Sequence, residues 1–166
     1  MTGDLDWGDI RSPFVDAMGL ELVEVGADRV VATLDAGPRH HQPEGIVHGG
    51  VWTAVVETLG SVGGAKAVWD DGRTVVGVHN ATDFLRPHVA GPVTAVGEPL
   101  HLGRTQQLWS VVVTRDDDDK VVARGQLRVA VIDRDRPGPP PDADPDPDPD
   151  PAPEPAPAPE PTEVPQ

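Results

Sequence analysis

The sequence of 166 residues contains no cysteine, which excludes disulfide bonds, thiolate catalysis and cysteine metal sites. It also lacks an apolar run long enough to span a membrane. Residues 1–6 lack the basic and apolar regions of a secretory signal. Basic residues are few, 13 against 28 acidic ones, which gives a net charge of −15. Because such a surface repels nucleic acid and anionic membrane, we expect neither as a partner and predict a soluble cytoplasmic protein.

The composition changes sharply after Arg136. Residues 137–166 contain no Lys or Arg and eight acidic residues, with a proline at about every second position. This segment therefore accounts for −8 of the total charge and leaves −7 for residues 1–136. Proline at this density removes backbone donors, and few apolar side chains are available for a core. We predict an arm over residues 1–19, in which Phe14 and Met18 help to cover part of the core, one domain over residues 20–136 and a disordered acidic, proline-rich tail over residues 137–166.

The pattern of apolar residues predicts an α+β fold. Two β-prone runs separated by a turn indicate a hairpin, and a loop and a long proline-free helix follow up to about Trp69. Four further β-prone stretches come after the helix, and in the last one Arg124, Gln126 and Arg128 alternate with apolar residues, which predicts one exposed and one buried face. We expect one long central helix packed on a single antiparallel sheet. The predicted strands are Leu20 to Val25, Val30 to Leu34, Thr74 to Phe84, Val93 to Leu102, Gln107 to Thr114 and Lys120 to Ile132. Asp116 to Asp119 are expected to form a hairpin turn.

The predicted helix has two different faces. One broad apolar face suits packing on the sheet; it comprises Val51, Trp52, Val55, Leu59 and Val62. The other face is small and lightly polar; it comprises Thr53, Ala54, Glu57, Gly60, Ser61 and Gly64. Because a solvated face is normally richer in charge, this second face is expected at an interface or beside a pocket. From the residues alone, Glu57 fits an ordinary exposed helix acid equally well.

The junction before this helix, Gln42 to Gly50, is suited to chemistry. Free N–H groups at a helix start and the positive end of its dipole favour a negative oxygen. Gly49 and Gly50 lack side chains, so a ligand is expected to approach the backbone closely there.

Several segments together resemble the hotdog-fold acyl-CoA thioesterases. These are G-I-V-H-G-G-V-W-T-A-V-V-E-T-L-G-S, then N-A-T-D-F-L-R-P and P-L-H-L-G-R, in that order. The resemblance covers roughly Met18 to Ile132 and is to the PaaI-like branch, within it to enzymes acting on 4-hydroxybenzoyl-CoA and 1,4-dihydroxy-2-naphthoyl-CoA. It implies a curved sheet around the helix, hydrolysis of an acyl-CoA, and no cofactor. A medium-chain fatty acyl or phenylacetyl-type substrate stays open.

The resemblance also implies roles for individual residues. Glu57 stands where the branch keeps its catalytic carboxylate, as general base or as nucleophile. Gly49 matches the residue whose N–H polarises the thioester carbonyl, with Gln42 and His48 near the reacting group. The substrate-binding residues that it implies or suggests are Ser61, Gly50, Arg86, Arg104 and Asn80, the two arginines as candidates for the CoA phosphates.

Spacing adds a constraint that does not depend on the resemblance. Gly49 and Glu57 are eight positions apart, which is roughly 12 Å along a helix. Because catalytic groups must lie within about 3 Å of their targets, one chain cannot use both on the same carbonyl. Two antiparallel helices related by a twofold axis would bring Glu57 of one subunit to Gly49 of the other. We therefore predict at least a dimer, and the resemblance implies a tetramer.

Other interpretations of the same residues remain open. His48 fits a helix cap, Ser61 a small contact residue, and each arginine an ion-pair partner in an acidic protein. His79 and His88 are weaker candidates for the same substrate channel. His40 and His41 are adjacent and point in different directions, so an exposed loop is preferred to a metal site. The alternative functions are a hotdog hydratase or dehydratase and an acyl-CoA binding protein without catalysis.

Overall fold

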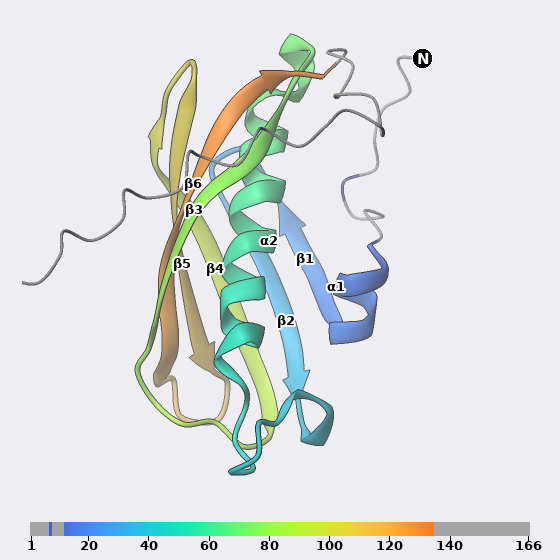
Figure 1. Ribbon diagram of the computed structural model, residues 1–166, viewed down its shortest axis with the longest axis vertical. Helices are drawn as coiled ribbons and strands as arrows, with labels where there is room; N and C mark the ends of the chain where they lie inside the picture. Colours follow the sequence, from blue (N-terminus) through green and yellow to red (C-terminus); the bar gives the residue numbers. More distant parts are fainter. Residues whose placement is uncertain (1–6, 8–11, 135–166) are drawn as a thin grey trace, which may run out of the picture. The chain divides into compact units, whose positions relative to one another are not determined.

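The computed structural model describes residue 7 and residues 12–134, which form a long helix against a six-stranded antiparallel sheet (Figure 1). The predicted tail over residues 137–166 lies outside the described residues, as does most of the predicted arm. The helices are α1 (Pro13–Met18) and α2 (Gly49–Val68), with short 3₁₀ helices η2 (Pro38–His40) and η3 (Trp69–Asp71). The strands are β1 (Leu20–Val25), β2 (Val30–Ala36), β3 (Arg73–Phe84), β4 (Gly91–Leu102), β5 (Gln106–Arg115) and β6 (Val121–Asp133).

The strands lie in the order β1-β2-β4-β5-β6-β3, and every neighbouring pair is antiparallel. All six predicted strands and the long helix are present, within two residues of the predicted bounds in most cases. The acidic turn between β5 and β6 closes through the Arg115 N–H, which donates to the Lys120 carbonyl at 3.0 Å. The α+β hotdog architecture expected from the sequence is therefore confirmed.

The core lies between α2 and the concave face of the sheet (Figure 1). Trp52, Val55 and Leu59 of α2 are almost fully buried, as the apolar face of the helix predicted. Full burial of each such side chain contributes about 1.5–3 kcal/mol. On β6 the side chains alternate as predicted, with Leu127 and Val129 in the core and the intervening arginines exposed. In the described residues, neither α helix has the length and apolar character of a membrane span.

The predicted division of α2 into two faces was partly wrong. Gly60 and Gly64 face the sheet, not an interface, because the sheet curves closely around the helix. A methyl group on Gly60 would lie 2.7 Å from Leu127 Cδ2, so large sheet side chains fill the room that the glycine leaves. Val62, expected on the sheet side, is only half-buried. Of the predicted small face, Thr53, Ala54, Glu57 and Ser61 remain on the outer side.

Helix α1 lies beside β1, and residues of α1 and of the outer side of α2 line one cavity (Figure 1). Pro13 occupies its first turn, where a missing N–H costs nothing, and Gly19 ends it in the left-handed conformation with φ 71°. Met18 is buried and joins the core. Phe14 does not: its side chain is 63% exposed, so the expectation that it helps to cover the core is wrong.

Candidate active site

His48 begins α2 as its N-cap. The His48 Nδ1 atom accepts a hydrogen bond from the Gly50 N–H at 2.8 Å, and the His48 N–H donates to the His40 carbonyl at 2.8 Å. These bonds place the ring proton on Nε2, because Nδ1 must keep its lone pair. The capping role weighed from the sequence is therefore present, and it holds the junction in place. The imidazole is exposed, so its other nitrogen can reach a ligand.

His40 stabilises this junction through hydrogen bonds of its ring and of its carbonyl. It is only 5% exposed, so its prediction as part of an exposed loop was wrong. Its Nδ1 accepts from the Gly37 N–H at 3.1 Å, and its Nε2 lies 2.8 Å from the Met18 carbonyl. The ring thus ties the end of α1 to the loop before α2, while the His40 carbonyl holds His48. Two adjacent histidines in the sequence do not indicate that His40 is buried, because its ring meets the end of α1, which is distant in the sequence.

Gly49 is the first residue of α2, and its N–H has no acceptor among the described residues. It lines a cavity of about 280 Å³ together with Gln42 and Arg86. The remaining lining is mostly apolar and includes Trp52, Phe84 and Leu85. An unused donor at the positive end of a 20-residue helix, bordering an apolar cavity, is suited to stabilising a developing oxyanion.

The space beside the two glycines is not open, contrary to the expectation from the sequence. A methyl group on Gly49 would lie 2.6 Å from Phe84 Cε2, and one on Gly50 would lie 2.9 Å from His48 Nδ1. The end of β3 reaches the start of α2 and lays the Phe84 ring against it. Side chains of the same chain therefore fill the space beside these glycines. A ligand would have to pass Phe84 to reach the Gly49 N–H.

Gln42 lies in a tight turn before the junction. Its N–H donates to the Ile46 carbonyl at 2.9 Å, and its Oε1 accepts from the Glu44 N–H at 2.9 Å. Its Nε2 group has no partner in the described part of the chain. Because Gln42 also lines the Gly49 cavity, this amide remains available as a second donor there.

Glu57 lies on the outer side of α2, two turns beyond Gly49, and is half-buried. It borders a second cavity, of about 300 Å³, between α1 and α2. This cavity is lined by Ser12, Phe14, Val15, Ala54, Glu57, Thr58, Ser61 and Val62. Glu57 and Ser61 thus line the same cavity, and among its described lining residues Glu57 is the only one with an ionisable side chain.

Asn80 connects Glu57 to the sheet. Its Nδ2 group lies 3.1 Å from Glu57 Oε2 and 3.1 Å from the Thr53 carbonyl, so both amide hydrogens bind within the chain. Asn80 was expected to contact the substrate, but its contacts are with the candidate catalytic residue.

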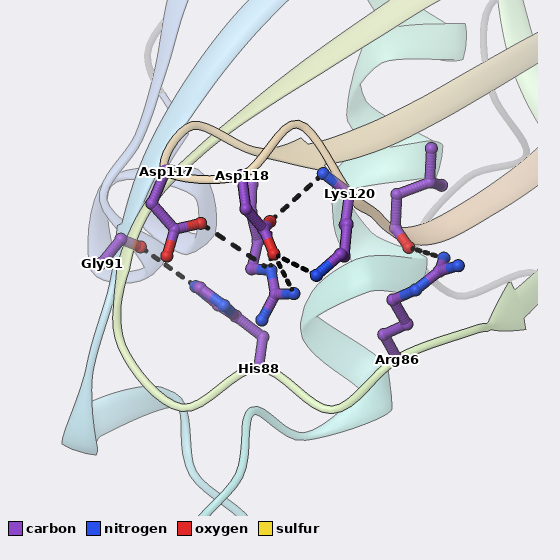
Figure 2. A network of polar contacts seen from close by, with 8 residues as sticks. Arg86, His88, Gly91, Asp117, Asp118 and Lys120 are labelled. Atoms are coloured by element: carbon purple, nitrogen blue, oxygen red, sulfur yellow. Dashed lines mark hydrogen bonds and ion pairs between the residues drawn. The ribbon is translucent and has the colours of Figure 1, made fainter.

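Figure 2 shows Arg86 and His88 in the segment after β3, close to the acidic turn between β5 and β6. Arg86 Nη1 donates to the Val121 carbonyl at 2.7 Å while the side chain stays exposed at the Gly49 cavity. His88 is buried, and its Nε2 lies 3.1 Å from the Gly91 carbonyl, so it does not line a channel. In the turn, a hydrogen bond from Lys120 lowers the pKa of Asp118 to about 2.

Two predicted residues lie elsewhere. Arg104 is in the turn between β4 and β5, and its carbonyl accepts from Arg73 at the start of β3. It therefore lies at the end of α2 opposite to Gly49 and joins neither cavity in this chain. His79 is exposed on β3. Within the described residues, no group of three His, Asp or Glu side chains could hold a metal ion.

Sequence reasoning missed the apolar walls of both cavities. Phe84 and Leu85 line one, and Phe14 and Val15 line the other. All four belong to elements that the sequence predicted only as a strand end or as an arm. The signal that could have found Phe84 is its place in D-F-L-R-P, where a strand ends on two large apolar residues in succession.

A long helix held in a curved six-stranded antiparallel sheet is the architecture of the hotdog class. The sequence profile described as "Thioesterase superfamily" matches residues 44–122. The chain belongs to this superfamily, as the resemblance predicted, and is a thioesterase.

Three relatives illustrate the relationship. A Mycobacterium tuberculosis protein that carries the general name esterase is 46% identical over 125 residues, which cover 73% of this chain and 87% of the relative. Its solved structure aligns with a TM-score of 0.72 and covers 76% of this chain and 100% of the other. The proofreading thioesterase EntH of Cronobacter turicensis is 37% identical, covering 71% and 85%. The 1,4-dihydroxy-2-naphthoyl-CoA hydrolase of Listeria monocytogenes is 33% identical, covering 70% and 93%.

Proposed function

We propose that this thioesterase hydrolyses an acyl-CoA to the free acid and CoA, with aryl-CoA thioesters as its preferred substrates. The observation that carries the proposal is the division of the candidate catalytic groups between two cavities. The oxyanion donor Gly49 and the amide of Gln42 border one cavity, and Glu57 borders the other. Each cavity holds one half of what thioester hydrolysis needs.

A second copy of the chain completes the site. Along α2, Gly49 and Glu57 are separated by roughly 12 Å, which is too far for both to act on one carbonyl. β3 supports a dimer, because it is a 12-residue edge strand that pairs on one side only, with β6. Its Val76 and Val78 are 44% and 51% exposed. A long apolar edge of this kind is normally covered in a native protein, here by the β3 of a twofold-related partner.

The reaction then follows from the groups at the joined site. Gly49 of one subunit donates its N–H to the thioester carbonyl oxygen, where negative charge develops. Glu57 of the other subunit removes a proton from water, whose oxygen attacks the carbonyl carbon. The tetrahedral intermediate expels the CoA sulfur, which takes up the proton. In the alternative route Glu57 attacks directly and water cleaves the resulting anhydride.

The cavity lining favours an apolar acyl group. The cavity beside Glu57 is walled by Phe14, Val15 and Val62, and its small polar groups are the hydroxyls of Ser12, Thr58 and Ser61. A hydroxylated aromatic ring matches this mixture, because its faces are apolar and its substituents can bind hydroxyls. The Listeria relative is named as a hydrolase of such a substrate. Arg86, exposed at the other cavity, is suited to a CoA phosphate.

The test is CoA release from a panel of benzoyl, hydroxybenzoyl, 1,4-dihydroxy-2-naphthoyl, phenylacetyl and medium-chain acyl-CoAs. Wild type is expected to cleave the aryl members best, and Glu57→Ala to lose nearly all turnover, a fall of at least about 10³-fold. Glu21→Ala, which removes an exposed acid on β1, is the matched control and should keep wild-type turnover. Retention of wild-type kcat by Glu57→Ala, or binding of acyl-CoAs without release of CoA, would overturn the proposal.

A further inference from the structure

The Glu57 carboxylate lies against a gap in the edge strand β3. One oxygen, Oε2, accepts a hydrogen bond from Asn80 Nδ2 at 3.1 Å. The other, Oε1, lies where a side chain on Gly77 would begin, so a methyl group there would overlap it. Both oxygens therefore meet β3, one at a donor and one at a residue that leaves room. No other described side chain donates a hydrogen bond to this carboxylate.

A β-bulge brings these two residues to the same side. Gly77 pairs with Val129 of β6, whereas His79 pairs with the adjacent Arg128, so Val78 is an extra residue in β3. Side chains alternate along a strand, so residues 77 and 80 would ordinarily point to opposite faces. The extra residue reverses the alternation, and both then face α2. The bulge is thus what directs Asn80 at Glu57.

The orientation of the Asn80 amide is itself fixed. Glu57 Oε2 and the Thr53 carbonyl oxygen only accept hydrogen bonds, which requires the NH2 group of the amide on their side and leaves Asn80 Oδ1 to accept from Thr82 Oγ1 at 2.7 Å. The Nδ2 group then faces Glu57 and the Thr53 carbonyl, and both of its hydrogens are used. An amide held at three points presents its donor to the carboxylate in one geometry.

We infer that Asn80 is a positioning residue for Glu57, with Thr82 holding the amide and Gly77 leaving space for the carboxylate. The inference rests on the proposed function of Glu57. The hydrogen bond to Oε2 holds Glu57 in one conformation against β3. Oε1, in the space beside Gly77, accepts no hydrogen bond from a described side chain and remains the oxygen available to take the proton. Because Asn80 acts through Glu57 and not on the substrate, it affects the chemical step more than binding.

The first test is Asn80→Ala, compared with wild type for kcat, KM and thermal midpoint. Loss of a hydrogen bond to a charged group should lower kcat roughly ten- to a hundredfold while KM stays within about twofold. Thr82→Val should lower kcat by a smaller factor, and Thr82→Ser, which keeps the hydroxyl, should restore it. Gly77→Ala should also lower kcat, because it displaces the carboxylate while Asn80 and Thr82 keep their own side chains.

A matched control separates positioning from loss of stability. Gln107 also ties a strand to α2 by an amide, since its Nε2 donates to the Gly64 carbonyl at 3.3 Å, but it lies away from Glu57. Gln107→Leu should lower the thermal midpoint and leave the kcat of the folded enzyme unchanged. In the Glu57→Ala background, Asn80→Ala should have no further effect on residual turnover, because its only route to the reaction is gone.

The outcomes distinguish the inference from the proposed function. If Glu57→Ala abolishes turnover but Asn80→Ala keeps wild-type kcat, the positioning role is wrong and the proposed function stands. An equal loss from Asn80→Ala with and without Glu57 would also overturn the inference, since it would indicate a general loosening of β3. If Glu57→Ala itself retains wild-type turnover, the proposed function fails first.

Discussion

Helix α2 contains two pairs of adjacent glycines, one at its start and one near its end, and the two pairs have different roles. Gly49 and Gly50 open the helix, where Gly49 lines a cavity and keeps an N–H without an acceptor among the described residues. Gly63 and Gly64 lie near the other end and are buried. Side chains of the sheet, Trp109 against Gly63 and Gln107 against Gly64, fill the space beside them.

This difference shows that the role of a glycine depends on what occupies the space where a side chain would otherwise lie. At Gly63 that room belongs to the core, so the residue sets how closely the sheet wraps the helix. At Gly49 the room is taken by Phe84, yet the backbone donor stays available. The first pair should therefore matter for turnover and the second for stability, and this contrast can be tested with one substitution at each end.

The largest effect is expected from replacing Gly49 with proline in a Phe84→Ala background. Proline is favoured at the first helical position and removes only the N–H, and His48, with φ −63° and ψ 136°, already has the conformation that precedes proline. Phe84→Ala removes the ring that the new side chain would meet. Relative to Phe84→Ala alone, we expect kcat to fall about 10²- to 10³-fold with no loss of thermal stability.

The same variant tests whether the site is shared between subunits. Glu57→Ala and the Gly49→Pro, Phe84→Ala protein should each be almost inactive alone. Mixed and reassembled, they should recover about a quarter of the parental turnover, because half of randomly assorted dimers are mixed and each contains one intact site. If the mixture stays inactive while mixed dimers form, the two cavities do not cooperate across a twofold axis.

A smaller and opposite effect is expected at the other end of the helix. Gly63→Ala would place a methyl group against the Trp109 ring and 2.9 Å from Val30 Cγ2. Overpacking of this kind costs about 1–3 kcal/mol, and the helix preference for alanine offsets at most about 1 kcal/mol. The thermal midpoint should fall by several degrees while kcat of the folded enzyme stays at the wild-type value. Gly37→Ala, where nothing lies within 4 Å, is the control; equal midpoints for the two variants would remove the contrast.

The fold could be predicted from the sequence because its elements have strong local patterns. The alternation on β6 and the proline-free run of α2 each indicated the structure that forms. The faces of α2 could not be assigned in the same way, because a sheet that curves around a helix buries more of its circumference than a flat one. Gly60 and Gly64 were consequently placed on the wrong side.

For the candidate site, the sequence located residues but not all their partners. Gln42, Gly49 and Arg86, which the motifs singled out, border one cavity, and Glu57 and Ser61 border the other. The contact between Asn80 and Glu57 could not be foreseen, since it depends on an extra residue in β3 that only strand pairing reveals. The α1 wall was hidden for a different reason, because six residues with one buried side chain carry too little pattern.

The smallest effect is expected at the α1 wall of the cavity beside Glu57, where a substitution should change substrate preference without changing stability. Phe14 is 63% exposed, so Phe14→Ala should leave the thermal midpoint unchanged, yet it lines the cavity beside Glu57. If the acyl group occupies that cavity, loss of the ring removes about 1 kcal/mol of contact with an aryl substrate, or roughly fivefold in kcat/KM. Flexible medium-chain acyl groups can refill the space, so their kcat/KM should change less and the ratio of aryl to aliphatic turnover should fall.

Val23→Ala removes a similarly exposed apolar side chain on β1 and should leave the ratio unchanged. An equal fall for both substrate classes would mean that α1 contacts a part of the thioester common to them, and no fall at all would place the acyl group elsewhere.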